Sequence, residues 1–175
     1  ARSLQSVVAA EFYTLVYTLS LIISFFTLGL DISLNYCLAR RAIRASLARR
    51  LILVVTFAGL VAGLALMALL SSAGYPHLDI HHLLILSGLH IAGGLFASLS
   101  AAIFTAGGRS HVPAKMAFVV NMIMIGISLF CDQRYAGISL IHIFFYLYFA
   151  GSLLQGLLLF FLSLRMPDHE PASSS

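Results

Sequence analysis

A few polar side chains interrupt the long apolar runs of this 175-residue chain, and their chemistry is the first guide to function. They comprise one carboxylate, two imidazoles and two amides: Asp31, His90, His142, Asn121 and Gln155. Imidazoles can line a polar cavity, and amides can hydrogen-bond to a polar substrate. The same side chains also form hydrogen bonds between helices, so each has a structural interpretation beside a functional one.

Asp31 is a candidate because a carboxylate at the centre of a bilayer costs about 2.5–3.5 kcal/mol on insertion scales. Its depth argues against a central position. Asp31 follows Glu11 by 20 residues, which is about 30 Å of helix, so the two carboxylates mark opposite surfaces. Two interpretations remain open: coupling to function, or a carboxylate that extends to the interface beside the arginine loop, which the depth favours.

The two histidines form a second candidate. His90 follows His82 by eight residues, and His142 follows Arg134 by eight, so both should lie about 12 Å inside the same surface. They could meet or line a cavity, although a hydrogen bond between helices, worth about 0.6 kcal/mol, is the simpler interpretation. Two ligands at one level are too few for a metal, so we expect no metal site and no cofactor.

Asn121 and Gln155 are the remaining strongly polar residues inside apolar runs. Gln155 precedes Arg165 by ten residues, which places it about 15 Å deep, near the midplane. Either amide could contact a polar substrate, but helix packing is the simpler interpretation. The chain shows no phosphate-binding loop, hydrolytic triad or paired carboxylates, so we expect no enzyme activity.

The elements that must position these residues follow from composition. The chain is 61% hydrophobic and 9% charged, with a mean hydropathy of +1.01, whereas about 25% of the residues in a soluble domain are charged. A spanning helix needs about 20 apolar residues. Five runs qualify, and helices are expected for all of them because lipid offers no hydrogen bonds to the backbone. The runs cover residues 12–36, 51–70, 83–106, 112–130 and 138–164.

The sequence therefore predicts an all-α, polytopic transmembrane bundle of about five spans over residues 1–165. Residues 166–175 are polar and expected to be a disordered tail. Small residues spaced by four, Gly59 with Gly63 and Gly94 with Ser98, should let helix backbones approach closely. Cys37 and Cys131 fall at opposite faces in this topology, so no disulfide between them is expected.

Basic residues gather on one side of the predicted bundle. Five lie in one loop: Arg40, Arg41, Arg44, Arg49 and Arg50. With alternating spans, one side holds eight Lys and Arg residues and the other holds Arg2 and Arg134. Positive loops stay cytoplasmic, which predicts an external N-terminus and a cytoplasmic C-terminus. The loop is either a topology determinant, which we favour, or a contact for anionic lipid headgroups.

Two further expectations concern the basic loop and the chain start. Residues 47–50 repeat the Leu-Ala-Arg-Arg sequence of residues 38–41, and this repeat predicts a short basic helix at the membrane interface. Nucleic acid is not expected as a partner, because apolar spans flank the loop. An odd number of spans with an external N-terminus and no signal peptide suggests a preceding helix.

Several short motifs resemble the polysaccharide flippases of the multidrug/oligosaccharidyl-lipid/polysaccharide exporter superfamily. Residues 11–13, a span, and then residues 28–34 before a basic loop are similar to that family's second helix. Residues 1–4 look like the end of its first helix, residues 106–109 before Pro113 resemble its loop between helices four and five, and residues 135–138 resemble the entry to helix six.

This resemblance implies a transporter that moves a lipid-linked oligosaccharide between leaflets of a bacterial inner membrane. The family has two six-helix lobes around a central cavity, and this chain would supply helices two to six of the first lobe. A second lobe or a homomeric partner is then implied, with Asp31, His90, Asn121, His142 and Gln155 as candidate cavity residues. One departure is that Asn35 and Tyr36 stand where family members often carry arginine.

Two other functions remain open. The chain could be a non-catalytic structural subunit of a larger membrane complex, which the absent second lobe favours. Residues 82–91 are also similar to a motif of the competence-type DNA-uptake channel family. That alternative requires an outer-side pore around His82, Ser87 and His90.

Overall fold

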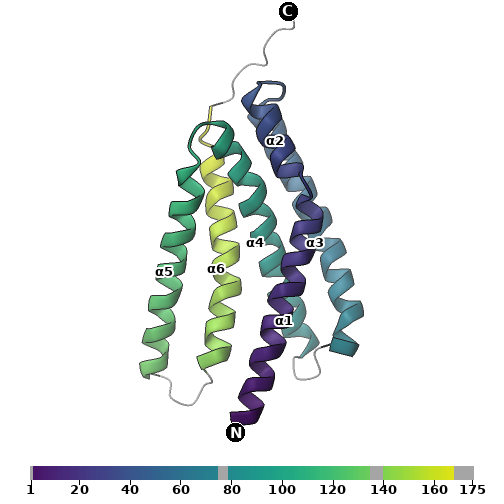
Figure 1. Cartoon of the computed structure of the whole chain (residues 1–175), viewed down its shortest axis with the longest axis vertical. Helices are drawn as coiled ribbons and strands as arrows, with labels where there is room; N and C mark the ends of the chain where they lie inside the picture. Colours follow the sequence, from purple (N-terminus) through teal and green to yellow (C-terminus); the bar gives the residue numbers. More distant parts are fainter. Residues whose placement is uncertain (1, 75–78, 135–139, 168–175) are drawn as a thin grey trace, which may run out of the picture.

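The computed structural model describes the backbone of residues 2–74, 79–134 and 140–167, and the side chains of residues 9–71, 79–130 and 143–167. Within these ranges the regular secondary structure is six α-helices (Figure 1). They are α1 (Arg2–Thr27), α2 (Leu30–Ala39), α3 (Ala45–Gly74), α4 (Ile80–Ala106), α5 (His111–Arg134) and α6 (Leu140–Ser163). Five of these are long and apolar enough to cross a membrane, which confirms the predicted all-α membrane bundle.

The first predicted span is wrong in its extent, because α1 ends at Thr27 and α2 begins at Leu30. Between them Gly29 has φ 79° and ψ −3°, a left-handed conformation that glycine adopts without steric cost. Hydropathy continues through Leu28 and Gly29, so composition alone predicts one helix. The span in α1 therefore covers Ala9–Thr27, and α2 is a separate short helix.

The five spanning helices alternate in direction, as predicted, and α2 continues in the direction of α1 (Figure 1). The end of α2, the start of α3, the connection from α4 to α5 and the end of α6 lie together at the top of Figure 1. We call this the basic end. The predicted interfacial helix is wrong: residues 40–44 are not helical, and residues 47–50 belong to the first turns of α3.

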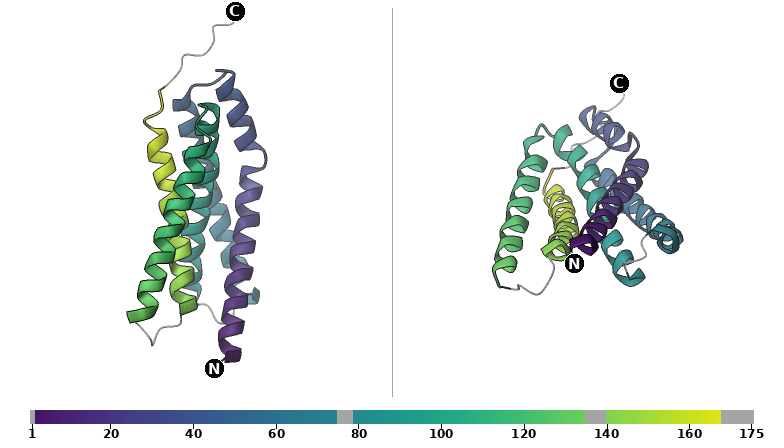
Figure 2. Two further views of the ribbon diagram at one scale, coloured as in Figure 1. Left: turned by 60° about the vertical axis from the view of Figure 1, so that its left-hand side comes forward. Right: turned by 60° about the horizontal axis from the view of Figure 1, so that its bottom comes forward.

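Helix α4 lies at the centre of the bundle and packs against α6, α3, α2 and α1, whereas α5 packs mainly against α6 (Figure 2). Two apolar clusters fill the interior. The first joins α1, α3, α4 and α6, and includes Phe12, Leu15, Leu19, Met67, Ile91 and Phe149. The second, toward the basic end, joins α2, α3, α4 and α6, and includes Leu34, Ile52, Leu99, Ile103 and Phe160.

Glycines permit the closest helix approaches. A Cβ on Gly93 of α4 would meet the backbone of Ser152 in α6, and one on Gly156 would meet the backbone of Gly93. On α3, Gly59 and Gly63 face the other side of α4. A Cβ at either position would lie 2.6 Å from a side-chain methyl group, of Leu95 or Ile91 respectively.

Two further predictions concern the packing residues Gly94 and Ser98 on α4 and the absence of a disulfide between the two cysteines. Gly94 faces the side chain of Ile23 in α1, and Ser98 is half-buried in α4. Cys37 is a free thiol, and the side chain of Cys131 lies outside the described residues.

The outer faces of α3 and α5 are apolar. Phe57 and Leu69 on α3 and Phe118 and Leu129 on α5 are large exposed side chains. Because these faces lie on helices long enough to cross a bilayer, hydrocarbon is their natural environment. The chain is therefore an integral, multi-pass membrane protein.

Candidate functional site

One side of α1 carries a row of polar side chains inside the span Ala9–Thr27. Tyr13, Tyr17, Ser20 and Ser24 follow one another at intervals of four, three and four residues. This spacing places all four on one face of a helix, which we call the α1 polar face. All four are exposed, and the two tyrosines are 68% and 67% accessible.

The opposite face of α1 explains this arrangement. Phe12, Leu15, Leu19 and Ile22 are buried in the core, whereas Leu21 and Phe25 are exposed beside the α1 polar face. The hydroxyl of Ser20 donates to the carbonyl of Val16 at 2.8 Å, which lowers the cost of its exposure. A helix that faced only lipid would expose apolar residues, as α3 does. The α1 polar face therefore suits water, a polar substrate or a polar partner.

Two adjoining hollows lie between α5 and α6, and one of them also borders α1. One, of about 410 Å³, is lined by Ala9, Tyr13, Ile125, Ser128, Leu129, Phe144 and Phe145. The other, of about 270 Å³, is lined by Asn121, Met124, Ile125, Ser128, Phe144, Leu147, Tyr148 and Gly151. They share three residues, so we describe them together as the α5–α6 groove.

The α5–α6 groove holds one of the predicted site residues, Asn121, whose side chain is exposed. Ser128 lies two helical turns further along α5. It is buried, and its hydroxyl has no hydrogen-bond partner among the described residues. The groove therefore combines an apolar lining with polar groups from α1 and α5, the usual composition of a small-molecule site.

His90 lies behind this groove, in the core. It is 6% exposed, and its ring centroid lies 5.5 Å from that of Tyr148 and 5.4 Å from that of Phe149. Its Nδ1 has no hydrogen-bond partner within the part of the chain that the structure describes. Ser87 is also buried, so the residues 82–91 motif turns largely toward protein rather than toward a pore.

The two histidines do not share a depth, contrary to the sequence prediction. His90 packs at the level of Tyr148 and Phe149, and Tyr148 follows His142 by six residues of α6. This is about 9 Å along the helix axis. The prediction counted eight residues of helix from Arg134, whereas α5 ends at Arg134 and α6 begins at Leu140. The side chain of His142 lies outside the described residues.

Asp31 and Gln155 are not part of the groove. Asp31 lies in the first turn of α2, where the positive end of a helix favours a carboxylate. Its Oδ1 accepts the N–H of Ile32 at 2.8 Å. Gln155 is half-buried in α6. Among the described residues, no three His, Cys, Asp or Glu side chains cluster as metal ligands would.

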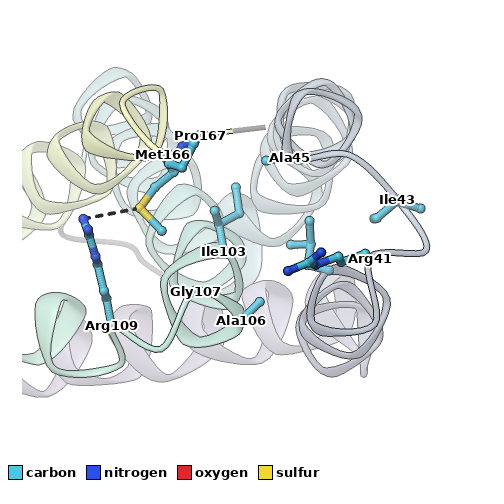
Figure 3. A pocket seen from close by; sticks show the side chains of 10 residues that line it. Arg41, Ile43, Ala45, Ile103, Ala106, Gly107, Arg109, Met166 and Pro167 are labelled. Carbon is cyan, nitrogen blue, oxygen red and sulfur yellow. Dashed lines mark hydrogen bonds between the residues drawn. The ribbon is translucent and has the colours of Figure 1, made fainter. Parts of the chain in front are cut away.

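A second hollow region lies at the basic end. This pocket, of about 310 Å³, is lined by Leu38, Arg41, Ile43, Ala45, Ile103, Ala106, Gly107, Arg109, Met166 and Pro167. We call it the basic pocket. Figure 3 shows Arg41 and Arg109 on opposite sides of Ile103 and Ala106.

The five arginines predicted as one cluster have different surroundings. Arg49 donates from Nη1 to the carbonyl of Ser163 at 2.8 Å and to that of Met166 at 3.3 Å, so it caps the end of α6. Arg40 lies 4.4 Å over the ring of Tyr36. Arg44 and Arg50 are exposed, and only Arg41 lines the basic pocket.

No family model, curated protein or solved structure matches this chain. The resemblance to polysaccharide flippases stays a prediction from short motifs. The sequence reasoning missed the α1 polar face and Arg109. The signal for the α1 polar face was the spacing of polar residues by four and three positions within an apolar run. No local signal marks Arg109, because the pocket is assembled from distant segments.

Proposed function

We propose that this chain is one lobe of a membrane transporter that moves a lipid-linked oligosaccharide between leaflets, together with a second lobe or another copy. The observation that carries the proposal is the α1 polar face. Tyr17, Ser20 and Ser24 are exposed on a helix within the hydrocarbon region. A polar headgroup that passes between two lobes would give these side chains the polar surroundings that lipid does not supply.

The α5–α6 groove supports the same proposal. Tyr13 belongs both to the α1 polar face and to the lining of the groove, so the two features are continuous. Asn121 adds an amide, and Phe144 adds apolar surface. An amphiphile with a polar head and a hydrocarbon tail matches this mixture better than a simple ion does.

The basic end gives the proposed orientation. It carries eight of the ten Lys and Arg residues, so the positive-inside rule places it in the cytoplasm. The start of α1 is then external, and the end of α6 is internal. We place the protein in a bacterial inner membrane, which the resemblance implies for a flippase.

Cysteine accessibility tests this proposal. In a background in which Cys37 and Cys131 are replaced by Ser, single cysteines are introduced by Ser24→Cys and, as a control, Val61→Cys. Gly63 packs on Ile22 and Gly59 on Phe26, so Ser24 and Val61 lie at matched depth. A membrane-permeant maleimide reacts with thiolates, which form in water and are suppressed in hydrocarbon. We expect Ser24→Cys to react much faster than Val61→Cys in native membranes.

A second pair extends the test toward the outer surface, with Tyr17→Cys against Leu69→Cys. Both positions are well exposed. Equal, slow labelling of all four cysteines would contradict a water-filled path along α1. Transport gives the complementary measurement. Movement of a fluorescent lipid-linked oligosaccharide in proteoliposomes with the complete assembly should fall with Ser20→Leu and remain with Phe57→Leu.

One observation favours the alternative, a non-catalytic subunit of a larger membrane complex. Ser20 and Ser24 are small hydroxyl residues of the kind that enrich interfaces between membrane helices. In that case a helix of another protein covers the α1 polar face permanently. Both serine positions would resist labelling in the intact complex and would react only after the partner is removed.

A further inference from the structure

The basic pocket has charged walls and an apolar floor. Arg41 follows α2 and Arg109 follows α4, and the two side chains approach the pocket from opposite sides (Figure 3). Leu38, Ile43 and Ile103 supply apolar surface between them. The space of about 310 Å³ therefore suits a ligand with negative charge at one end and hydrocarbon at the other.

Both arginines are available to such a ligand. Arg49 already donates to two backbone carbonyls, whereas the Nη1 of Arg109 lies 3.8 Å from the sulfur of Met166, a weak acceptor. Within the described side chains, neither Arg41 nor Arg109 has an acidic ion-pair partner. Among the described side chains, no carboxylate therefore competes with an anion for these two guanidinium groups.

The backbone at Arg41 gives an independent observation. Helices α2 and α4 end in the same motif, in which two hydrogen bonds of 3.0 and 2.8 Å close a left-handed turn. In α4 the left-handed residue is Gly108 with φ 70°, but in α2 it is Arg41 with φ 55°. The chain keeps a guanidinium at a position that sterically favours glycine, which agrees with a use for that side chain.

We propose that the basic pocket binds the phosphate group of an anionic membrane phospholipid. A guanidinium fork pairs with two phosphate oxygens, and the pocket offers one such fork from Arg41 and one from Arg109. The pocket lies where the spans of α3 and α4 reach Ala45 and Ala106, which is the depth of lipid headgroups. Its apolar floor would accept the start of the acyl chains. The site does not depend on transport.

The test uses the full chain, purified in a zwitterionic detergent. Binding of dioctanoyl phosphatidylglycerol, dioctanoyl phosphatidylcholine and inorganic phosphate is measured by native mass spectrometry. We expect phosphatidylglycerol to bind most tightly. The double variant Arg41→Gln/Arg109→Gln should weaken its binding about tenfold or more. The control Arg44→Gln/Arg50→Gln removes two charges from exposed side chains at the same end and should weaken binding less than about twofold.

Three outcomes would overturn the proposal. Equal losses in the two double variants would show only a general attraction of anions to the basic end. Equal affinity for phosphatidylcholine would show that the arginines do not select charge, and equal affinity for inorganic phosphate would show an anion site without a lipid. The single variant Arg41→Gly keeps the test usable if the double variant fails to fold. It suits the left-handed backbone and should also lose binding.

Discussion

Arg41 and Gly108 occupy equivalent left-handed positions. Removing the side chain at the first and adding one at the second should therefore change stability in opposite directions. Arg41→Gly relieves the steric cost of a side chain at φ 55° and should raise the free energy of unfolding by about 1 kcal/mol. Gly108→Ala introduces that cost at φ 70° and should lower it by a similar amount. Unfolding by SDS in mixed micelles measures both. Destabilisation by Arg41→Gly would show that its side chain supports the fold.

Arg49 and Arg50 offer a second matched pair at the residue scale. Arg49→Gln removes donors to the carbonyls of Ser163 and Met166, and Ser163 is buried. We expect a loss of about 1–3 kcal/mol, because the two carbonyls lose the charged donor and the Ser163 carbonyl keeps only the N–H of Met166. Arg50→Gln, at an exposed position, should change stability by less than about 0.5 kcal/mol. Equal effects in SDS unfolding would contradict a capping role for Arg49.

The sequence predicts the basic loop as a group, but the structure gives its arginines different partners. Arg49 caps a helix end that lies 114 residues away along the chain, and Arg41 faces Arg109 across a pocket. Such assignments depend on tertiary packing rather than on local spacing. For the same reason, Asp31 looks like a charge within a span until the break at Gly29 places it at a helix start.

At the scale of elements, the five spans are predictable because hydropathy and length are local properties. The break after α1 is not predictable in this way, because Leu28 and Gly29 are both compatible with an apolar run. A single residue in the left-handed conformation, Gly29, separates the two helices. The predicted start of the last span, residue 138, lies two residues from the start of α6 at Leu140. The depth predicted for His142 depends instead on counting from Arg134, the last residue of α5, and that count treats the connection to α6 as helix.

The contact between α4 and α6 gives a prediction at this scale. Gly93→Ala places a methyl group against the backbone of Ser152, which cannot rotate away, so we expect a loss of about 1–3 kcal/mol. Gly126→Ala in α5 meets nothing within 4 Å and should stabilise the protein by up to about 1 kcal/mol through helix propensity. SDS unfolding compares the two. A neutral Gly93→Ala would mean that the helices separate at little cost.

At the scale of the whole molecule, the sequence predicts alternating helices but not their neighbours. Every span is apolar, so hydropathy cannot show that α4 lies at the centre or that α5 touches mainly α6. The candidate groove depends on these neighbours, and among the predicted cavity residues whose side chains the structure describes, Asn121 alone lines it. The distribution of charge, by contrast, is visible in sequence, and it predicts the orientation of the whole bundle.

The orientation can be measured with two cysteines in a background that lacks Cys37 and Cys131. His81→Cys lies at the start of α4, and Ser110→Cys lies in the connection between α4 and α5 at the basic end. Both positions are exposed, so a difference in labelling reports the side of the membrane rather than burial. In intact bacterial cells, an impermeant maleimide should label His81→Cys, and Ser110→Cys should react only after permeabilisation.

The physical reason is the excess of eight basic residues over two, which opposes translocation of the basic end. This prediction also constrains the pocket, because anionic phospholipids in the cytoplasmic leaflet would then face Arg41 and Arg109. The reverse labelling pattern would turn the pocket toward the external side and would remove the topological basis for a cytoplasmic lipid site. Labelling of both cysteines in intact cells would instead indicate a mixed orientation, in which the charge asymmetry is too weak to direct insertion.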